Sequence, residues 1–305
     1  MEWFILACIA PFLYNITVLT DQYLSRRYFH DHSTAVLVLG SVFYPIPLCI
    51  YAYIAAGHLD LPPRDIMLAV MTGVISLISF FPYIRAIERS DSSIVVSLFQ
   101  IIPIMVLILA WIFLDEPLSA QNILVIIAIT CASAFMTYNA DDKKFDWHVL
   151  LNMAICCILL AITVLVERAL LLKHSWEAIS VYSYPGHFIL GFTILLTHRK
   201  SQRKIKEVLK ESRGKVLYFS FSQEAIYMLA VAVTFISFAS APPPAPSLRP
   251  ISSLQPVYGF AMSAVLASFL PTMFSHLPRG TDLLVKMIGL AVIISGSFYL
   301  ALATA

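Results

Sequence analysis

The chain has 305 residues, of which 59% are hydrophobic and only 12% are charged, and its mean hydropathy is +0.83. Soluble domains carry roughly 25% charged residues on average, so this composition excludes an ordinary soluble protein and indicates a membrane protein. The net charge of +2 is too small to suggest nucleic-acid binding.

Ten segments are long and apolar enough to cross a bilayer, which takes about 20 mostly apolar residues in helical form. In chain order they are residues 3–20, 34–56, 65–84, 92–114, 118–138, 147–166, 177–196, 216–239, 251–270 and 283–303. Each is expected to be a helix, because lipid leaves unpaired backbone groups unsatisfied. No basic region precedes the first segment and no clear cleavage site follows it, so it is interpreted as a span and not as a signal peptide.

Two sequence echoes divide the chain into halves. The phrase ITVL closes the first span at residues 16–19 and the sixth span at residues 162–165. A weaker echo relates a set of four residues to another set 155 positions later: Ala86, Ser92, Ser97 and Gln100 to Ala241, Ser247, Ser252 and Gln255. We therefore predict an all-α membrane protein of two five-helix repeats, residues 1–140 and 141–305. An odd number of helices makes the repeats inverted.

Basic residues are concentrated on one side of this topology. Odd-numbered connections carry 15 Lys and Arg residues and even-numbered connections carry 4, which places the odd connections in the cytoplasm and both termini outside. The richest stretch is the predicted basic loop 197–215 between spans seven and eight. Residues 198–215 are either a solvated topological anchor or a binding surface for anionic lipid.

The stretch 84–136 resembles EamA-type members of the drug/metabolite transporter superfamily. The similarity rests on the Ala86-Ile87 exit from span three, on Phe99-Gln100 with Pro103, and on the acidic turn Asp115-Glu116; residues 251–260 and 280–302 extend it to the second half. It implies a ten-helix bundle with a central cavity that transports small organic solutes. Family members are expected to hold both termini in the cytoplasm, opposite to the Lys/Arg count. The proline-rich connector 242–250 also departs from the family pattern.

Glu224 is the acidic residue that lies farthest from any predicted span end. It shares one helical face with Ser220, Gln223 and Tyr227, and such a polar stripe should face the bundle interior. An ionisable residue inside a membrane is expensive and suggests function. Glu224 either binds a cationic part of the substrate or a proton, or it is a hydrogen-bonded carboxyl that ties helices together.

Two glutamines occupy matching places in spans four and nine. Gln100 and Gln255 are each followed by a proline, Pro103 and Pro256, which frees backbone carbonyls nearby. They either line a substrate site near the bilayer midplane or act as interhelical hydrogen-bonding groups. His187 follows Pro185-Gly186 and is either a proton relay or a partner for a carbonyl released by the kink.

Tyrosines and a few polar residues complete the candidate list. Tyr14 and Asn15 in span one are candidate cavity residues, and Tyr83, like Tyr44, either stacks on a substrate or anchors the chain at the membrane interface. Asp21 and Glu167 lie at predicted span ends and are expected to be gate or interface residues.

Enzyme and cofactor signatures are missing from the sequence. It contains no HExxH, Gly-rich phosphate loop or GxSxG motif, its five cysteines show no CxxC spacing, and nothing completes a metal site around His30-Asp31-His32. We therefore expect a multi-pass secondary transporter of the cytoplasmic (inner) membrane, with no enzyme activity, cofactor or metal, present as a monomer or weak homodimer. The alternative is a membrane receptor or assembly subunit that binds without transporting.

Overall fold

The computed structural model describes most of the chain. It covers residues 2–29, 32–54, 59–90, 92–99, 101–114, 119–135, 138–139, 144–171, 173–240, 255–269 and 280–303. In the first half the helices are α1 (Glu2–Leu24), the π-helical turn η1 (Ser25–Phe29), α2 (Ser33–Ser41), α3 (Pro45–Ile54), α4 (Pro63–Arg89), α5 (Ser92–Leu98), α6 (Ile101–Leu114) and α7 (Ala120–Phe135). A two-residue antiparallel pair, β1 (Tyr138–Asn139) and β2 (Lys144–Phe145), leads into the second half.

After β2, the regular elements in the described part of the second half are all helices. It contains α8 (Trp147–Leu171), α9 (Trp176–Thr197), α10 (Arg199–Glu211), α11 (Lys215–Ser240), α12 (Gln255–Phe269) and α13 (Gly280–Ala303). Four helical stretches within the described residues are long and apolar enough to cross a membrane, namely Pro63–Arg89, Trp147–Leu171, Trp176–Thr197 and Lys215–Thr234. The proline-rich connector 242–250 lies outside the described residues.

Each predicted span coincides with one helix or with two short helices in succession. The second span is broken between α2 and α3, where Phe43 and Tyr44 donate backbone hydrogen bonds to residues three positions earlier. The break falls before Pro45 because proline has no N–H to continue the helical ladder. The fourth span is divided in the same way into α5 and α6.

The prediction of a loop at residues 197–215 is wrong, because most of this basic segment forms the helix α10. Arg199–Glu211 contains no glycine or proline, and the ring of His198 caps its start by accepting a hydrogen bond from the Ser201 backbone N–H. Ser201, Ile205 and Val208 are buried at helical spacing, so the chain folds here as an amphipathic helix. Its Lys and Arg side chains occupy the remaining faces.

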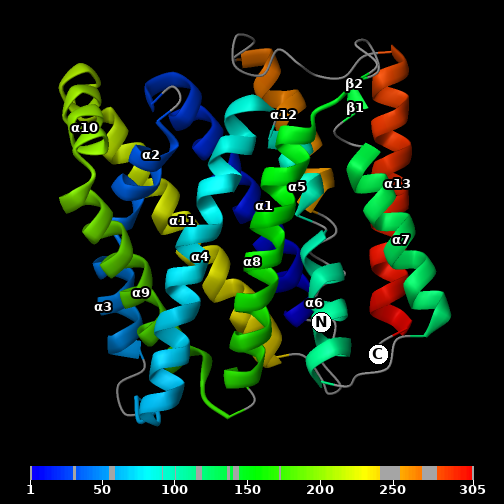
Figure 1. The fold of residues 1–305 in the computed structure, drawn as a ribbon, viewed down its shortest axis with the longest axis horizontal. Coiled ribbons are helices and arrows are strands. Elements are labelled where there is room, and N and C mark those ends of the chain that lie inside the picture. Colours follow the sequence, from blue (N-terminus) through cyan, green and yellow to red (C-terminus); the bar gives the residue numbers. More distant parts are fainter. Residues whose placement is uncertain are drawn as a thin grey trace.

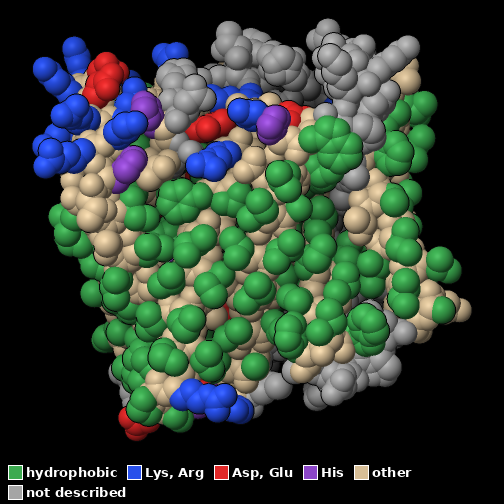
Figure 2. All heavy atoms as spheres, in the orientation of Figure 1, with side chains coloured by type: hydrophobic (Ala, Val, Ile, Leu, Met, Phe, Trp, Pro, Cys, Tyr) green, Lys and Arg blue, Asp and Glu red, His purple; other side chains and the backbone are tan. Residues whose placement is uncertain are grey.

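The helices run between two edges of the bundle (Figure 1). Helix α10 and the β1–β2 pair lie at one edge, and both marked chain ends lie in the opposite half of the picture. Lys, Arg and His side chains gather around α10, while the band between the edges is largely hydrophobic (Figure 2). We call the edge that carries α10 the basic edge. A wide exposed apolar band is the surface expected of a protein embedded in lipid.

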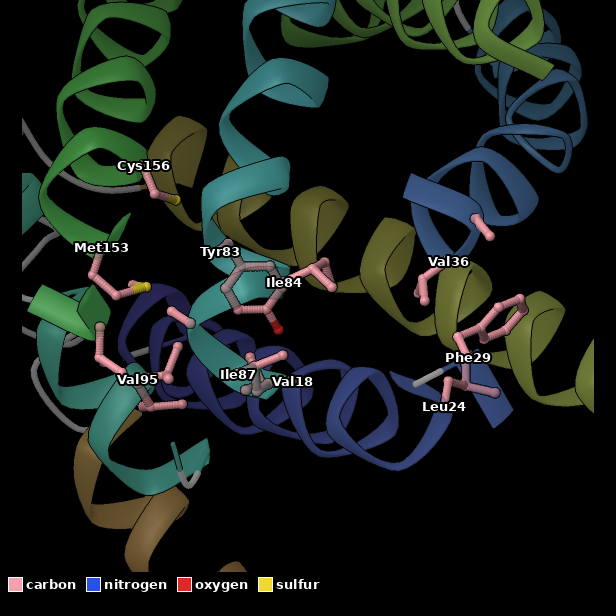
Figure 3. Close-up of a cluster of buried hydrophobic side chains, with 14 of the residues drawn as sticks. Val18, Leu24, Phe29, Val36, Tyr83, Ile84, Ile87, Val95, Met153 and Cys156 are labelled. Atoms are coloured by element: carbon pink, nitrogen blue, oxygen red, sulfur yellow. The ribbon is translucent and has the colours of Figure 1, made fainter. Parts of the chain in front are cut away.

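A large buried cluster holds the middle of the bundle together. It joins α1, α2, α4, α5 and α8, with Ile84 and Ile87 of α4 and Met153 of α8 almost fully buried (Figure 3). Helix α4 packs along α8 and α9, and α1 packs along α11. The approach of α4 to α9 requires glycine, since a Cβ at Gly73 would overlap the Ser183 carbonyl and one at Gly186 would overlap that of Val70.

Candidate functional site

A cavity of about 90 Å³ lies between helices of both halves of the chain. Its wall is formed by α1, α2, α4, α11, the start of α12, the turn between α2 and α3, and Phe99 directly after α5. The polar side chains on this wall are Tyr14, Thr17, Asp21, Tyr44, Tyr83, Gln223, Glu224, Tyr227 and Gln255. Five of the predicted site residues are therefore brought together here: Tyr14, Tyr83, Glu224, Tyr227 and Gln255.

Glu224 is held by α11 with only 8% of its surface exposed. One carboxylate oxygen, Oε2, has no hydrogen-bond partner among the described residues. The other, Oε1, lies against Gly40 of α2, where a Cβ atom would overlap it. Gly40 therefore leaves the space that this carboxyl occupies, and Tyr44 beside it lines the same cavity.

Asp21 belongs to the same cavity, although the sequence led us to expect a gate or interface residue. The predicted first span ended at residue 20, whereas α1 continues to Leu24 and carries Asp21 on the cavity wall. The Tyr83 hydroxyl donates a 2.9 Å hydrogen bond to Asp21 Oδ2, and Figure 3 shows Tyr83 reaching from α4 toward α1. The signal that identifies Asp21 is its spacing from Tyr14 and Thr17, which continues one helical face past the end of the predicted span.

Asn15 is close to the cavity but does not line it. Its side chain is fully buried, and Nδ2 donates to the Pro11 carbonyl at 2.9 Å and to the Gln255 carbonyl at 2.8 Å. Asn15 thus ties α1 to the start of α12 and fixes the backbone of the glutamine that does line the cavity. Gln100 lies outside the described residues.

His187 lies behind the cavity wall on α9. Its ring is 4.8 Å from the ring of Tyr44, centroid to centroid. Its Nδ1 lies 3.4 Å from the Ser183 carbonyl, which is one turn earlier in α9 and before the proline at 185. This contact matches the interpretation in which a histidine pairs with a carbonyl near the kink, and its Nε2 has no partner among the described residues.

A group of hydrogen-bonded polar residues lies where α1 and α4 end, toward the basic edge. We call it the basic-edge cluster, formed by Gln22, Ser25, Arg26, Glu88, Ser90, Ser92 and Ser263. Its members come from the end of α1, η1, the end of α4, the start of α5, and α12. The cluster therefore joins the first half of the chain to the second.

Hydrogen bonds link the basic-edge cluster from one helix to the next. Ser25 Oγ donates to Glu88 Oε1 at 2.9 Å, and an Arg26 guanidinium nitrogen donates to the Ser90 carbonyl at 2.6 Å. With its amide oriented to satisfy its neighbours, Gln22 donates to Ser92 Oγ at 2.7 Å and accepts from Arg26 at 2.9 Å. The hydroxyls of Ser92 and Ser263 lie 3.3 Å apart.

The opposite edge carries its own connection between helices. His174 Nε2 lies 2.7 Å from Asp65 Oδ2, which joins the first turn of α4 to the segment between α8 and α9. The Tyr182 hydroxyl donates to the Leu59 carbonyl at 2.8 Å close by. Among the described residues, no group of three or more His, Cys, Asp or Glu side chains is placed to hold a metal ion.

A helical membrane bundle with a buried polar cavity is the class of protein that this fold and site define. Comparison with known families makes the class more specific: the EamA-like transporter family matches residues 1–138. This confirms the resemblance to the drug/metabolite transporter superfamily and indicates a membrane transporter of small solutes.

A solved structure shares the fold over nearly the whole chain. One protein crystal structure covers 99% of this chain and 97% of its own, with a TM-score of 0.57 and 10% sequence identity. Identity this low shows the fold alone. A comparison with curated proteins gave no match.

Proposed function

We propose that the protein is a secondary transporter of the cytoplasmic (inner) membrane that moves a small organic solute by alternating access. The observation that carries the proposal is the cavity that buries Asp21 and Glu224 between helices of both halves. Burying charged groups in the membrane interior is costly and is rarely retained without a function. A cavity at the junction of two repeats is where repeat-built transporters bind their substrates.

The pattern of helix packing supports two repeats of five helices. If α1, α2–α3, α4, α5–α6 and α7 correspond to α8, α9, α11, α12 and α13, then the α1–α11 pair corresponds to the α8–α4 pair. Both pairs are among the most extensive contacts in the bundle. Equivalent helices also meet each other directly, as α7 meets α13 and α5 meets α12. When each repeat packs against the other in this reciprocal way, the two repeats can exchange conformations, which gives inward-open and outward-open states of similar energy.

The basic edge supports an orientation with this edge in the cytoplasm. Its Lys and Arg residues surround α10 (Figure 2), and basic residues are retained on the cytoplasmic side. The basic-edge cluster would then be the cytoplasmic closure of the cavity. The contact between Ser92 and Ser263 would have to break when the cavity opens toward the cytoplasm. A solute or proton gradient would drive the transport cycle.

Uptake into proteoliposomes tests this proposal. Purified protein is reconstituted and screened for saturable uptake of amines, amino acids, nucleosides and drugs at two pH values. The variant Glu224→Gln removes the charge from the cavity, and its matched control is Glu207→Gln on the outer face of α10, where the side chain is 56% exposed. We expect saturable uptake that is lost in the first variant and retained in the second.

A receptor or assembly subunit is the competing function, and the exposed basic face of α10 favours it. That face would bind anionic lipid head groups or an acidic partner. On this alternative, ligands stabilise the purified protein but are not taken up under any gradient, and neutralising Lys206 and Lys210 together releases the partner or lipid. Saturable uptake would exclude it.

A further inference from the structure

We propose that the cavity recognises an organic cation whose compact alkylammonium head group lies between Glu224 and Asp21. This inference rests on the proposed function and names the substrate class of the same site. Two carboxyl groups line the cavity, and none of the described lining residues is Lys, Arg or His. An anionic solute, or the carboxylate of a zwitterion, would find no cationic partner on this wall.

The unpaired oxygen of Glu224 points to a missing positive partner. Its residue is more than nine-tenths buried and lines the cavity, and Oε2 has no hydrogen-bond partner among the described residues. Leaving a buried carboxylate oxygen unpaired is unfavourable, because that oxygen has lost its hydration without gaining a hydrogen-bond partner. A cation in the cavity supplies that interaction without any rearrangement of α11.

Five aromatic rings on the cavity wall form one continuous series. Tyr14 contacts Tyr227 at 6.0 Å between ring centroids, and Tyr227 contacts Phe80 at 6.1 Å. Phe80 contacts Tyr83 at 5.9 Å, and Tyr83 contacts Phe99 at 5.5 Å. All five rings line the cavity. Ring faces attract ammonium groups, and cages of aromatic side chains are a recurring means of binding quaternary ammonium ligands.

Protons compete with the cation for the same two carboxyl groups. In an environment of low dielectric constant two neighbouring carboxyls do not both stay charged without a partner, so binding of a cation should be coupled to release of a proton. Binding should therefore tighten as pH rises. The titratable groups that share the cavity wall with this pair are Tyr14, Tyr83, Tyr44 and Tyr227, from α1, α4, the α2–α3 turn and α11. His187 of α9 lies behind this wall, against the ring of Tyr44.

Choline and 3,3-dimethylbutan-1-ol provide the test, because they have the same shape and differ only in the positive charge. Binding of each to the purified wild-type protein is measured by calorimetry at about pH 6 and about pH 8. We expect choline to bind at least about tenfold more tightly than the neutral alcohol, with a larger ratio at the higher pH. Equal affinities, or no measurable binding of choline at either pH, would overturn the inference.

Variants then assign the charge recognition to the cavity. Glu224→Gln should weaken choline binding by about tenfold or more, and Asp21→Asn should weaken it as well. Glu224→Asp keeps the charge and should retain measurable binding, which guards against loss of folding in the amide variant. Glu207→Gln on α10 should bind like wild type. Unchanged choline affinity in both amide variants would contradict the assignment.

Binding and uptake separate this inference from the proposed function. Choline binding that depends on Glu224 but no uptake of any solute would support cation recognition and reject transport. Saturable uptake of an anionic or neutral solute, with no choline binding, would support transport and overturn cation recognition. Uptake of [14C]choline, inhibited by other alkylammonium ions and not by the neutral alcohol, would support both.

Discussion

The α1–α11 pair and the α4–α8 pair are the two most extensive helix contacts among the described residues, and each joins a helix of the first half to one of the second, yet their interiors differ. Helices α1 and α11 bring Asp21, Glu224 and Tyr227 to the cavity. Helices α4 and α8 enclose Ile87, Met153 and other side chains that are almost fully buried in the main hydrophobic cluster (Figure 3). The α1–α11 pair borders the site. The contact between α4 and α8 is packed core, and α4 reaches the cavity only by another face, which carries Leu77, Phe80 and Tyr83.

This difference separates residues that stabilise the bundle from residues that serve transport. Both pairs need close helix packing, and apolar or small side chains satisfy that need in the α4–α8 pair. The α1–α11 pair instead retains carboxyls that cost stability in a membrane. Substitutions of the cavity residues of α1 and α11 should therefore change transport with little effect on stability. Substitutions of side chains buried in the contact between α4 and α8 should do the reverse.

The largest expected effect on transport comes from Glu224→Gln. Removing the charge should lower the initial rate of uptake roughly a hundredfold, since a buried charged partner contributes several kcal/mol. The melting temperature of the purified variant should be equal to or above that of wild type, because a buried carboxyl with one unpaired oxygen is removed. Rate and melting temperature are measured on the same preparation. A fall in stability that accounts for the lost rate would contradict the division of roles.

Gly40→Ala should have the next largest effect. The added Cβ would overlap Glu224 Oε1 and force it to move. The move is possible because this oxygen is the far end of a flexible side chain. We expect ligand affinity to fall about tenfold, which corresponds to the loss of one charge-assisted contact. The protein should remain folded. The control is Ala35→Gly on the same helix, a buried residue that does not line the cavity. Wild-type affinity in Gly40→Ala would show that the position of Glu224 is unimportant.

Tyr83→Phe should produce a smaller change. It removes the hydroxyl that donates to Asp21 Oδ2 at 2.9 Å but keeps the aromatic ring on the cavity wall. Hydrogen bonds inside membrane proteins contribute about 0.6 kcal/mol on average, so affinity should change by roughly threefold. Calorimetry on both proteins resolves this difference. A loss as large as that of Glu224→Gln would mean that Tyr83 contacts the ligand through its hydroxyl.

Met153→Ala should have the smallest effect on transport and the largest on stability. Met153 is fully buried in the α4–α8 pair and away from the cavity wall. Its truncation should lower the free energy of unfolding in detergent micelles by about 2–5 kcal/mol, with uptake per folded molecule changed less than about twofold. A specific loss of uptake in a stable Met153→Ala protein would place the α4–α8 pair in the transport mechanism.

Much of the fold follows from the sequence, because long apolar runs must be helical in lipid. Each predicted span coincides with a helix or a broken pair of helices. Hydropathy located the apolar residues but did not locate helix ends, so α1 was predicted too short and Asp21 was assigned outside the cavity. Hydropathy also predicted a loop at residues 197–215, because this stretch is too polar to span a membrane. Ile205 and Val208 instead lie on the buried face of the helix α10.

The site was predicted in part, and the missing part depended on tertiary contacts. A polar face on an apolar helix identified Glu224 and Tyr227, since that pattern is local. Asn15 was predicted to line the cavity, but it bonds the Gln255 carbonyl, a contact between residues 240 positions apart. The basic-edge cluster likewise depends on which helices meet, and the sequence does not contain that information in a local form.

Alternating access is tested most directly by locking the basic-edge cluster. Ser92 and Ser263, whose hydroxyls lie 3.3 Å apart on α5 and α12, are both replaced by cysteine in a background without the five native cysteines. Solute uptake by proteoliposomes is measured before oxidation, after oxidation and after reduction, with each single-cysteine protein as a control. Mass spectrometry verifies the disulfide.

We predict saturable uptake in the reduced protein, loss of uptake when the disulfide forms, and recovery on reduction, with the single-cysteine proteins unaffected throughout. Full uptake with a verified disulfide would contradict alternating access through the basic edge. An absence of saturable uptake for every solute, in protein that still binds ligand, would contradict transport itself and support the receptor function.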